Sequence, residues 1–391
     1  MTSFTLAALL APHPVDRFFE TIYERAHLHV RGTDPDRFAG LISTARIDAL
    51  VSGQVFAGDQ LSMARSGGGK IAPGDYLTDG LADPGLVARR YQEGATLILP
   101  QLHRRERPLA DLCRALEAEL SHPVQTNIYL TPPTAKGFET HFDNHDVFVL
   151  QVEGRKRWRL YGAPAGTPYR GERFTPGGYA PGDLAAELVL EPGDVIYVPR
   201  GIMHDAVNEN ADGPSLHVTT GVLARTWADW LLEAVGEAAL KSPALRRALP
   251  PGFHDGRVPS AVFETAFAEA LDHVRRNADL EAVTALFCDR FTETRTADVS
   301  GAILRGPEAG DAAIALRPGL PCRLAEDGDH VALLAPGGPL QFDRAAEPAL
   351  ERLLAGETLG RSDFAAMGED KARDAVARLV AFGAARIVPE R

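Results

Sequence analysis

The chain has 391 residues, of which 45% are hydrophobic and 24% charged, and its formal net charge is −12. That length predicts two or three domains, and the composition is that of an ordinary globular protein. The negative charge argues against a general binder of nucleic acid or anionic membranes, because phosphate groups require a basic face, and it would favour a basic partner.

The cysteines and the apolar segments predict the cellular compartment of the protein. Cys113, Cys288 and Cys322 are odd in number and widely spaced, which favours neither a disulfide framework nor a C-x-x-C zinc site and predicts a reducing cytoplasm. The opening MTSFTLAALLAPHP lacks a cationic segment and a cleavage site, so we expect an amphipathic helix there and not a signal peptide. No run approaches the roughly 18 apolar residues of a membrane span.

Residues 1–120 predict mixed, mostly helical structure. A helix running into a short strand is expected over 14–32, and an acidic start with helical apolar spacing predicts a second helix over 34–53. The segment GATLILPQLH (94–103) is typical of a buried strand, and RPLADLCRALEAELSH (107–122) of an amphipathic helix.

From residue 124 the apolar period changes to that of strands. Seven short β-rich runs are separated by Gly, Pro, Asn and Asp, with no helical stretch between them, at 124–133, 146–154, 156–162, 186–194, 195–201, 205–210 and 215–223. This pattern predicts a β-sandwich or small barrel.

After residue 224 the chain turns helical again, with i, i+3, i+4 apolar spacing over 226–241, 259–277 and 280–294. The last ninety residues alternate strands and helices (329–336, 348–356 and 370–390), and the helix–helix–strand order resembles a winged-helix unit. Residues 342–391 hold nine acids and eight bases, so they lack the basic face of a DNA reader and favour a packing or dimerisation module.

A metal-ligand pattern lies in the β-rich region. His141 and Asp143 form an H-x-D pair before a strong strand, and His204 follows a Pro-Arg-Gly corner about sixty residues later. Two imidazoles and one carboxylate with open positions favour non-haem Fe(II) and oxygen chemistry. Each histidine taken alone would more often be a surface residue or a buried residue with its hydrogen bonds satisfied. Their shared β-rich context strengthens the case that both are metal ligands.

Other histidines and charges near the pattern have competing interpretations. His145 has a zinc-like spacing only on a helix, so in an extended segment we expect it beside the site or on the surface. His217 either lines the pocket or is a satisfied core histidine. Arg200 and Asp205 either orient His204 and gate the pocket or stabilise the turn.

A cationic anchor for a cosubstrate is available in RKRW (155–158). Lys156 alternates with Arg155 and Arg157 along the strand, so it faces inward if they face outward. A buried lysine must be paired, and a dicarboxylate would pair it. The competing interpretation is a solvated basic run.

The runs NIYLTPP…GF…HFDNHDVFVLQVEGRKRWRLY and LEPGDVIYVPRGIMHDA resemble the ribosomal oxygenase group of JmjC-type cupins, densely over 126–222. The resemblance implies Fe(II), 2-oxoglutarate and O2 as cofactor and cosubstrates, and a metal triad of His141, Asp143 and His204. It further implies that Lys156 holds the distal carboxylate, and that Asn127 and Thr219 lie in the pocket. The arginine-hydroxylating branch has arginine at the position of Lys156, so the lysine makes this chain more similar to the histidine-hydroxylating branch.

The expected fold is therefore mixed α+β. A double-stranded β-helix with a mostly helical N-terminal part spans 1–223, a helical dimerisation region 224–296, and a winged-helix-like domain 297–391. The predicted function is a cytoplasmic, homodimeric dioxygenase that hydroxylates a side chain of a basic ribosomal protein, without direct contact with nucleic acid or membrane. Two alternatives stay open, which are a hydroxylase of a small peptide precursor or free amino acid, and a non-catalytic scaffold or regulator.

Overall fold

The computed structural model describes residues 4–65, 69–135, 139–169, 171–208, 212–305 and 307–388. The chain forms two compact units, Met1–Ala224 and Arg225–Arg391, called here the N-terminal and C-terminal units. The further division of the second unit at residue 296 stays a prediction. None of the helices in the described ranges is long and apolar enough to cross a bilayer.

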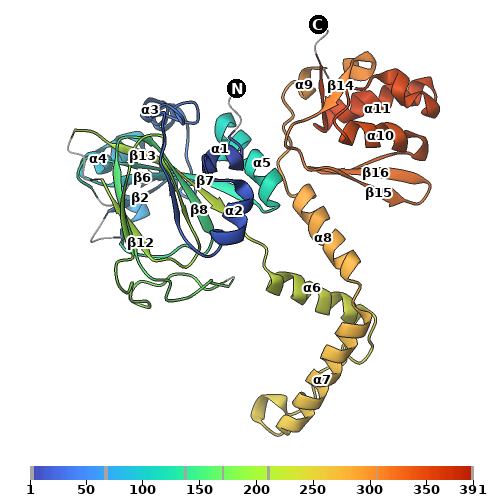
Figure 1. Ribbon diagram of the computed structural model, residues 1–391, viewed down its shortest axis with the longest axis horizontal. Helices are drawn as coiled ribbons and strands as arrows, with labels where there is room; N and C mark the ends of the chain where they lie inside the picture. Colours follow the sequence, from blue (N-terminus) through green and yellow to red (C-terminus); the bar gives the residue numbers. More distant parts are fainter. Residues whose placement is uncertain are drawn as a thin grey trace. The chain divides into compact units, whose positions relative to one another are not determined.

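The N-terminal unit is built on two antiparallel sheets (Figure 1). The larger sheet has the order β1-β11-β8-β13-β7-β6-β2-β3, and the smaller one the order β10-β9-β12. The strands are β1 (Leu28–Val30), β2 (Ser62–Arg65), β3 (Gly69–Lys70), β6 (Thr96–Leu99), β7 (Val124–Thr131), β8 (Asp146–Glu153), β9 (Lys156–Leu160), β10 (Ala186–Leu190), β11 (Val195–Val198), β12 (His204–Val207) and β13 (Ser215–Val222). A separate hairpin joins β4 (Leu77–Thr78) to β5 (Leu81–Ala82).

The seven strands predicted between 124 and 223 are confirmed, although residues 209 and 210 of one run lie outside the described ranges. β1 and β6, which extend the large sheet, confirm the short strand expected within 14–32 and the buried strand expected over 94–103, but no strand was predicted for the segments that form β2 and β3. These strands are two to four residues long, which is too short for period-2 alternation to be recognised.

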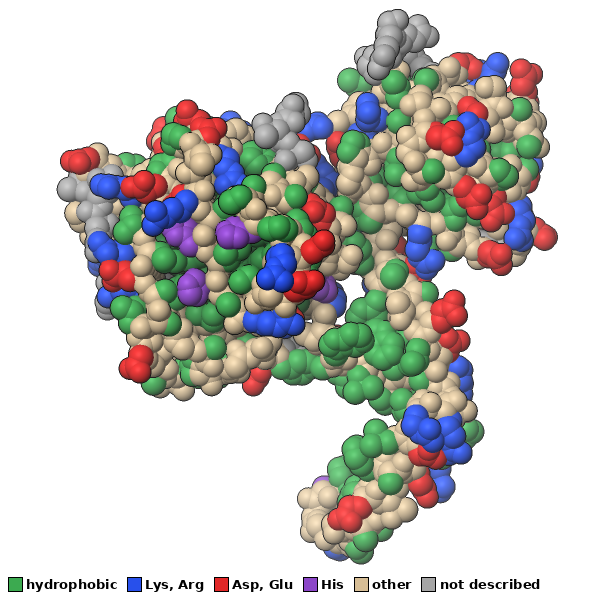
Figure 2. All heavy atoms as spheres, viewed as in Figure 1, with side chains coloured by type: hydrophobic (Ala, Val, Ile, Leu, Met, Phe, Trp, Pro, Cys, Tyr) green, Lys and Arg blue, Asp and Glu red, His purple; other side chains and the backbone are tan. Residues whose placement is uncertain are grey.

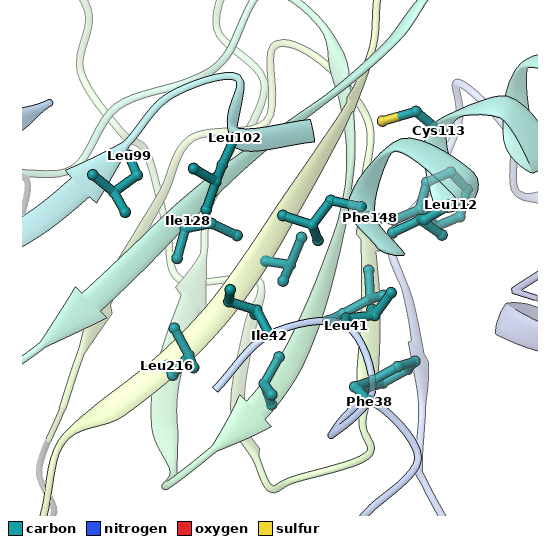
Figure 3. Packing of buried hydrophobic residues seen from close by; sticks show 14 of the residues in the cluster. Phe38, Leu41, Ile42, Leu99, Leu102, Leu112, Cys113, Ile128, Phe148 and Leu216 are labelled. Atoms are coloured by element: carbon teal, nitrogen blue, oxygen red, sulfur yellow. The ribbon is translucent and has the colours of Figure 1, made fainter. Parts of the chain in front are cut away.

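The large sheet is covered on one face by α1 (Leu6–Leu10), α2 (Val15–Thr21), α3 (Thr44–Gly53), α4 (Pro84–Gln92) and α5 (Arg107–Leu120), together with the loop that holds Phe38 and Leu41. Figure 3 shows Ile128, Phe148 and Leu216 of the sheet packed in this core. The helix predicted over 34–53 is shorter, because the hydroxyl of Ser43 accepts from Arg46 N and starts α3 at Thr44.

Strand parity divides the large sheet into two chemically different faces. On β8, Phe148 and Leu150 point into the helix-covered core, whereas Val147 and Val149 join Trp158 and other apolar residues between the two sheets. The same alternation runs along β7 and β13, where Ile128 and Val218 point into the helix-covered core. Successive residues of a strand point to opposite faces, so the intervening residues of these strands face the space between the sheets.

The C-terminal unit begins with three helices, α6 (Trp227–Leu240), α7 (Ser260–Asn277) and α8 (Leu280–Glu293), and α6 contacts both of the others. Its remainder has a separate core built from α10 (Glu347–Leu354), α11 (Glu369–Ala381), the pair β14 (Ile314–Leu316) and β18 (Ala385–Ile387), and the sheet β15 (Arg323–Asp327), β16 (His330–Ala335), β17 (Gly338–Asp343). A short helix, α9 (Ala302–Arg305), precedes these strands. The helices predicted after residue 224 are confirmed, as are the later strands and helices up to residue 388. The winged-helix assignment stays a prediction.

Candidate metal centre and cosubstrate pocket

Three residues predicted as metal ligands come together at one end of the space between the sheets. One possible ligand atom from each of His141, Asp143 and His204 lies within 4.8 Å of the others. Nε2 of His204 is 3.8 Å from Oδ2 of Asp143, and the two imidazole centroids are 4.7 Å apart. Within the described residues, this is the group of three or more His, Cys, Asp or Glu side chains that lie at such distances from one another.

The backbone brings the two ligand segments together directly. His141 N donates to His204 O at 3.0 Å, and His204 N donates to His141 O at 2.7 Å, so the two histidines form a reciprocal antiparallel bridge. Gly201 N also donates to Asp143 O at 3.0 Å. His141 is therefore extended at the bridge, as predicted, but the residues after it form a loop before β8 begins.

Hydrogen bonds to carbonyl groups determine which imidazole nitrogen carries the hydrogen in the neutral ring. Nδ1 of His141 lies 2.8 Å from Glu139 O, and Nδ1 of His204 lies 2.9 Å from Ile202 O. A carbonyl oxygen only accepts, so in the neutral ring Nδ1 carries the hydrogen and Nε2 keeps its lone pair. This is the arrangement of metal-binding histidines whose other nitrogen is held by the protein.

Electrostatics favours a neutral imidazole at His204 and an ionised carboxylate at Asp143. Burial, and next the neighbouring His141, lower the pKa of His204 to about 4. Burial raises the pKa of Asp143, but the nearby His145, His204 and His141 outweigh it and bring that pKa below its usual value. At neutral pH His204 therefore offers a lone pair and Asp143 a negative charge, and a set of two imidazoles and one carboxylate suits a divalent cation of intermediate softness.

The cluster opens into a cavity between the two sheets. Strands β7, β8, β9, β12 and β13 supply most of its wall, and Thr96 of β6 contributes as well. The lining residues are Thr96, Tyr129, His141, Asp143, Val147, Val149, Lys156, Trp158, His204, Ala206, His217 and Thr219.

Lys156 is the buried cation of this cavity. It is 3% exposed and faces inward, and its Nζ donates to Thr131 Oγ1 at 2.8 Å. Among the described residues no carboxylate lies within salt-bridge distance of it, and burial lowers its pKa to about 7. Arg157 next to it points the other way, toward Glu187 at 2.6 Å. The expected alternation is confirmed, and the alternative of a solvated basic run is wrong for Lys156.

Two further predicted pocket residues, His217 and Thr219, line the cavity. The ring of His217 stacks on Tyr129 with centroids 4.9 Å apart and lies edge-on to Trp158 at 5.7 Å. Burial, and next the charge of Lys156, hold the pKa of His217 well below its usual value. Its Nδ1 is buried and has no hydrogen-bond partner in the described part of the chain, so it is not a satisfied core histidine.

Asn127 lies on β7 with the same strand parity as Tyr129 and Thr131. It is paired in register with Thr219, but it does not line the cavity, and its Oδ1 accepts from Gln101 N at 3.0 Å. Gln101 has a left-handed backbone (φ 53°), so this bond supports a strained turn just after the end of β6. Its predicted role next to the cosubstrate stays a prediction.

Several site residues escaped the sequence interpretation. Thr131 and Tyr129 share the inward parity of β7, and that parity could have indicated both. Trp158 follows from Lys156 by the same rule. Thr96 lies on the four-residue strand expected over 94–103, but every residue of that strand is buried, so the sequence does not indicate which face Thr96 takes.

The residues around the triad are positioned by polar contacts. His145 lies beside the site, and its ring occupies the space where a Cβ of Gly221 would be. Arg200 stabilises the turn, because it pairs with the buried Asp146 at 2.7 Å. Asp205 points away from the cavity and accepts hydrogen bonds from other strands and loops.

The fold and the cluster together define a cupin-type barrel with a two-histidine, one-carboxylate centre. Comparison with known proteins agrees, because residues 101–230 match the JmjC domain family. The chain is 35% identical over 257 residues to ribosomal oxygenase 1 of Homo sapiens, an alignment that covers 63% of this chain and 39% of that protein. It is 34% identical over 256 residues to the bifunctional lysine-specific demethylase and histidyl-hydroxylase NO66 of Drosophila grimshawi, covering 63% and 35%.

Solved structures show the same fold over nearly the whole chain. The ribosomal oxygenase YcfD of Escherichia coli superposes with a TM-score of 0.55 at 17% identity, covering 96% of this chain and 98% of that one. The chain spans about two fifths of the length of the curated relatives named above. Residues 101–230 match the JmjC domain and the chain is similar to the ribosomal oxygenases, which confirms the family resemblance. The solved structure confirms the mixed α+β cupin-type fold.

Proposed function

We propose that the chain is an Fe(II)- and 2-oxoglutarate-dependent dioxygenase that hydroxylates an amino-acid side chain of a ribosomal protein. The observation that carries this proposal is a single cavity with His141, Asp143 and His204 in its wall together with the buried, carboxylate-free cation Lys156. Relatives named ribosomal oxygenase support the substrate class, and a YcfD structure in complex with cobalt and 2-oxoglutarate supports the ligands.

The triad fits an iron ion. His141 and His204 would each bind through Nε2, because their Nδ1 atoms are held by carbonyl groups, and Asp143 would supply the charged oxygen. Three protein ligands leave open positions for a cosubstrate and oxygen. When bound, the iron would couple the oxidative decarboxylation of 2-oxoglutarate, which yields succinate and carbon dioxide, to insertion of an oxygen atom into a C–H bond.

Lys156 and Thr131 would hold the far carboxylate of 2-oxoglutarate, and the contact between ammonium and carboxylate would be a charge-assisted hydrogen bond. Val147, Val149 and Trp158 line the cavity with apolar surface that excludes water. His217 and Thr219 lie in the same wall, and we propose that they contact the cosubstrate. The chain's share of catalysis is to orient these groups and keep the cavity dry.

The first test is succinate formation from 2-oxoglutarate after anaerobic reconstitution with Fe(II), with and without ribosomal protein fragments. We expect turnover that rises with one fragment and that His141→Ala abolishes. His13→Ala is the matched control, because His13 is an exposed histidine of the same unit. If His141→Ala consumed 2-oxoglutarate at the wild-type rate, the site assignment would be wrong.

The same assay separates the alternative functions. Iron-dependent turnover that is indifferent to every ribosomal fragment would favour a small peptide or free amino acid as substrate. Bound iron without any succinate would favour a non-catalytic scaffold or regulator. For the favoured case we propose a histidine side chain as the target, supported by Lys156 and by relatives named histidyl-hydroxylase. Mass spectrometry of the stimulating fragment would locate the added oxygen atom.

We also propose that the chain is a cytoplasmic homodimer that associates through α6, α7 and α8 in residues 224–296. Hydrophobic side chains gather along α6 and α7 (Figure 2), including Trp227 at 84% exposure, Leu240 at 73% and Phe267 at 66%. Large exposed apolar patches mark protein interfaces. Light scattering should report a dimer that Phe267→Glu converts to a monomer, whereas Val55→Glu, which is 67% exposed in the N-terminal unit, should not. A wild-type monomer at micromolar concentration would exclude this interface.

Residues 297–391 would form a winged-helix-like domain without a role in nucleic-acid binding. Three strands, β15–β17, and the helices α10 and α11 share one core, which supports the first part. The balance of nine acids and eight bases over 342–391 supports the second. Binding of duplex DNA or RNA at physiological salt, measured by fluorescence anisotropy, would contradict it.

A further inference from the structure

Asp205 is a buried carboxylate on the side of β12 that faces away from the cavity. It is 2% exposed, and the described side chains that donate hydrogen bonds to it include three residues. Thr140 Oγ1 donates at 2.8 Å, Arg159 Nε at 2.9 Å and Tyr161 OH at 3.2 Å. Arg159 is also its ion-pair partner and lies directly opposite it in the register of β9 and β12.

The neighbours of these residues in the sequence make the arrangement relevant to the metal centre. Asp205 follows His204, and Thr140 precedes His141. The hydrogen bond between Thr140 and Asp205 therefore joins the residues that flank the two histidine ligands. It lies beside the backbone bridge formed by the histidines and adds a side-chain connection to the backbone bonds that already join the two ligand segments.

The two segments differ in how much support they have. His204 begins β12, which pairs along its length with β9. His141 lies in the irregular stretch between β7 and β8, and its Nδ1 bonds to Glu139 O of the same stretch. That bond orients the ring of His141 without attaching its segment to the barrel. Thr140 makes such an attachment, through a carboxylate that β9 holds in place.

We propose that Asp205 is a positioning residue, which holds the His141 segment against β12 through Thr140 and thereby sets the affinity of the triad for a divalent metal. This inference rests on the proposed function, because it takes the triad to be a metal site. Hydrogen-bonding groups behind metal ligands commonly change metal affinity by about 10- to 100-fold when removed.

The test is the dissociation constant of Co(II), titrated alone into the metal-free full chain and followed by calorimetry. Thr140→Val removes the hydroxyl and keeps shape and charge, so we expect the dissociation constant to rise about tenfold or more. Thr140→Ser keeps the hydroxyl and should restore the wild-type value. Thr44→Val is the matched control, because Thr44 Oγ1 donates to Glu153 Oε2 at 2.7 Å, a similar bond that joins no ligand segment.

A double-mutant cycle tests the route through Thr140. Asp205→Ala removes the acceptor and should weaken Co(II) binding, and adding Thr140→Val to it should weaken binding little further, since both changes break the same contact. Fully additive effects would overturn the proposal, as would a Thr140→Val protein that binds Co(II) as tightly as Thr44→Val does. Thermal unfolding of each metal-free variant separates loss of affinity from loss of folding. A wild-type chain that binds no Co(II) would instead refute the metal site and the proposed function.

Discussion

Binding of 2-oxoglutarate should draw one proton into the pocket at mildly alkaline pH, because of the state of Lys156 before the ligand arrives. Burial lowers the pKa of this lysine from 10.5 to about 7. At pH 8 roughly nine in ten molecules would then hold a neutral amine, from the definition of the pKa. A carboxylate at hydrogen-bond distance favours the ammonium form and returns the pKa toward its ordinary value. We therefore expect uptake of about 0.9 proton for each 2-oxoglutarate bound at pH 8.

The pH dependence of affinity follows with a definite sign. The complex binds more protons than the free protein at pH values above about 7. Affinity should therefore be constant below this pH and fall by up to about tenfold for each pH unit above it, equivalent to roughly 1.4 kcal/mol. The free energy of unfolding has the opposite dependence on pH. Between pH values of about 7 and 10.5 the lysine is protonated in the unfolded chain and neutral in the folded one, so stability rises with pH across that window.

The assay is calorimetry of 2-oxoglutarate binding to Co(II)-loaded protein at pH 8, in two buffers that differ in ionisation enthalpy. The difference between the two apparent enthalpies gives the number of protons taken up. Lys156→Met should remove the part of the buffer dependence that comes from the lysine. Any buffer dependence left in this variant measures the protons exchanged at the metal. Arg157→Met is the control, because Arg157 belongs to the same strand but points outward to Glu187. A binding enthalpy that is equal in both buffers would refute the reasoning.

Two further predictions concern the packing around the site. Gly221→Ala should lower the free energy of unfolding by about 1–3 kcal/mol, since its Cβ would lie 2.4 Å from the His145 ring, whereas Gly236→Ala, in an open position on α6, should raise it by up to about 1 kcal/mol. Urea unfolding measures both, and equal effects would contradict the predicted clash. Arg200→Met should cost about 3–5 kcal/mol, because it leaves the fully buried Asp146 without its cation. A cost under about 1 kcal/mol in the same experiment would mean that solvent or another group neutralises Asp146.

Strand parity made the inner wall of the barrel predictable from the sequence. Lys156 was expected to face inward because it alternates with two arginines, and it does. The same rule applied to β13 accounts for His217 and Thr219, which both line the cavity. These inferences succeed because period-2 alternation is local, so it needs no knowledge of which strands become neighbours.

The parts that depend on distant pairing could not be predicted. The bridge between His141 and His204 joins residues 63 positions apart, and the Thr140–Asp205 contact joins residues 65 apart. The residue types in these two contacts do not indicate which distant residue each will pair with. Asp205, for example, could equally have stabilised its own turn. The bond from Gln101 N to Asn127 Oδ1 is a further contact between separate segments that the residue types alone did not indicate.

The polar groups of the cavity bear on the choice between an enzyme and a scaffold. Burying Lys156 without a carboxylate costs up to about 5 kcal/mol at neutral or lower pH, the energy equivalent of moving its pKa from 10.5 to about 7. Trp158 Nε1 and His217 Nδ1, which belong to the same wall, are also buried without a hydrogen-bond partner among the described residues. An apolar filling of the same space would be more stable, because each buried polar group that lacks a partner costs free energy. A bound anion would recover part of this cost, so the interior chemistry favours a ligand-binding enzyme over a scaffold that needs only the fold.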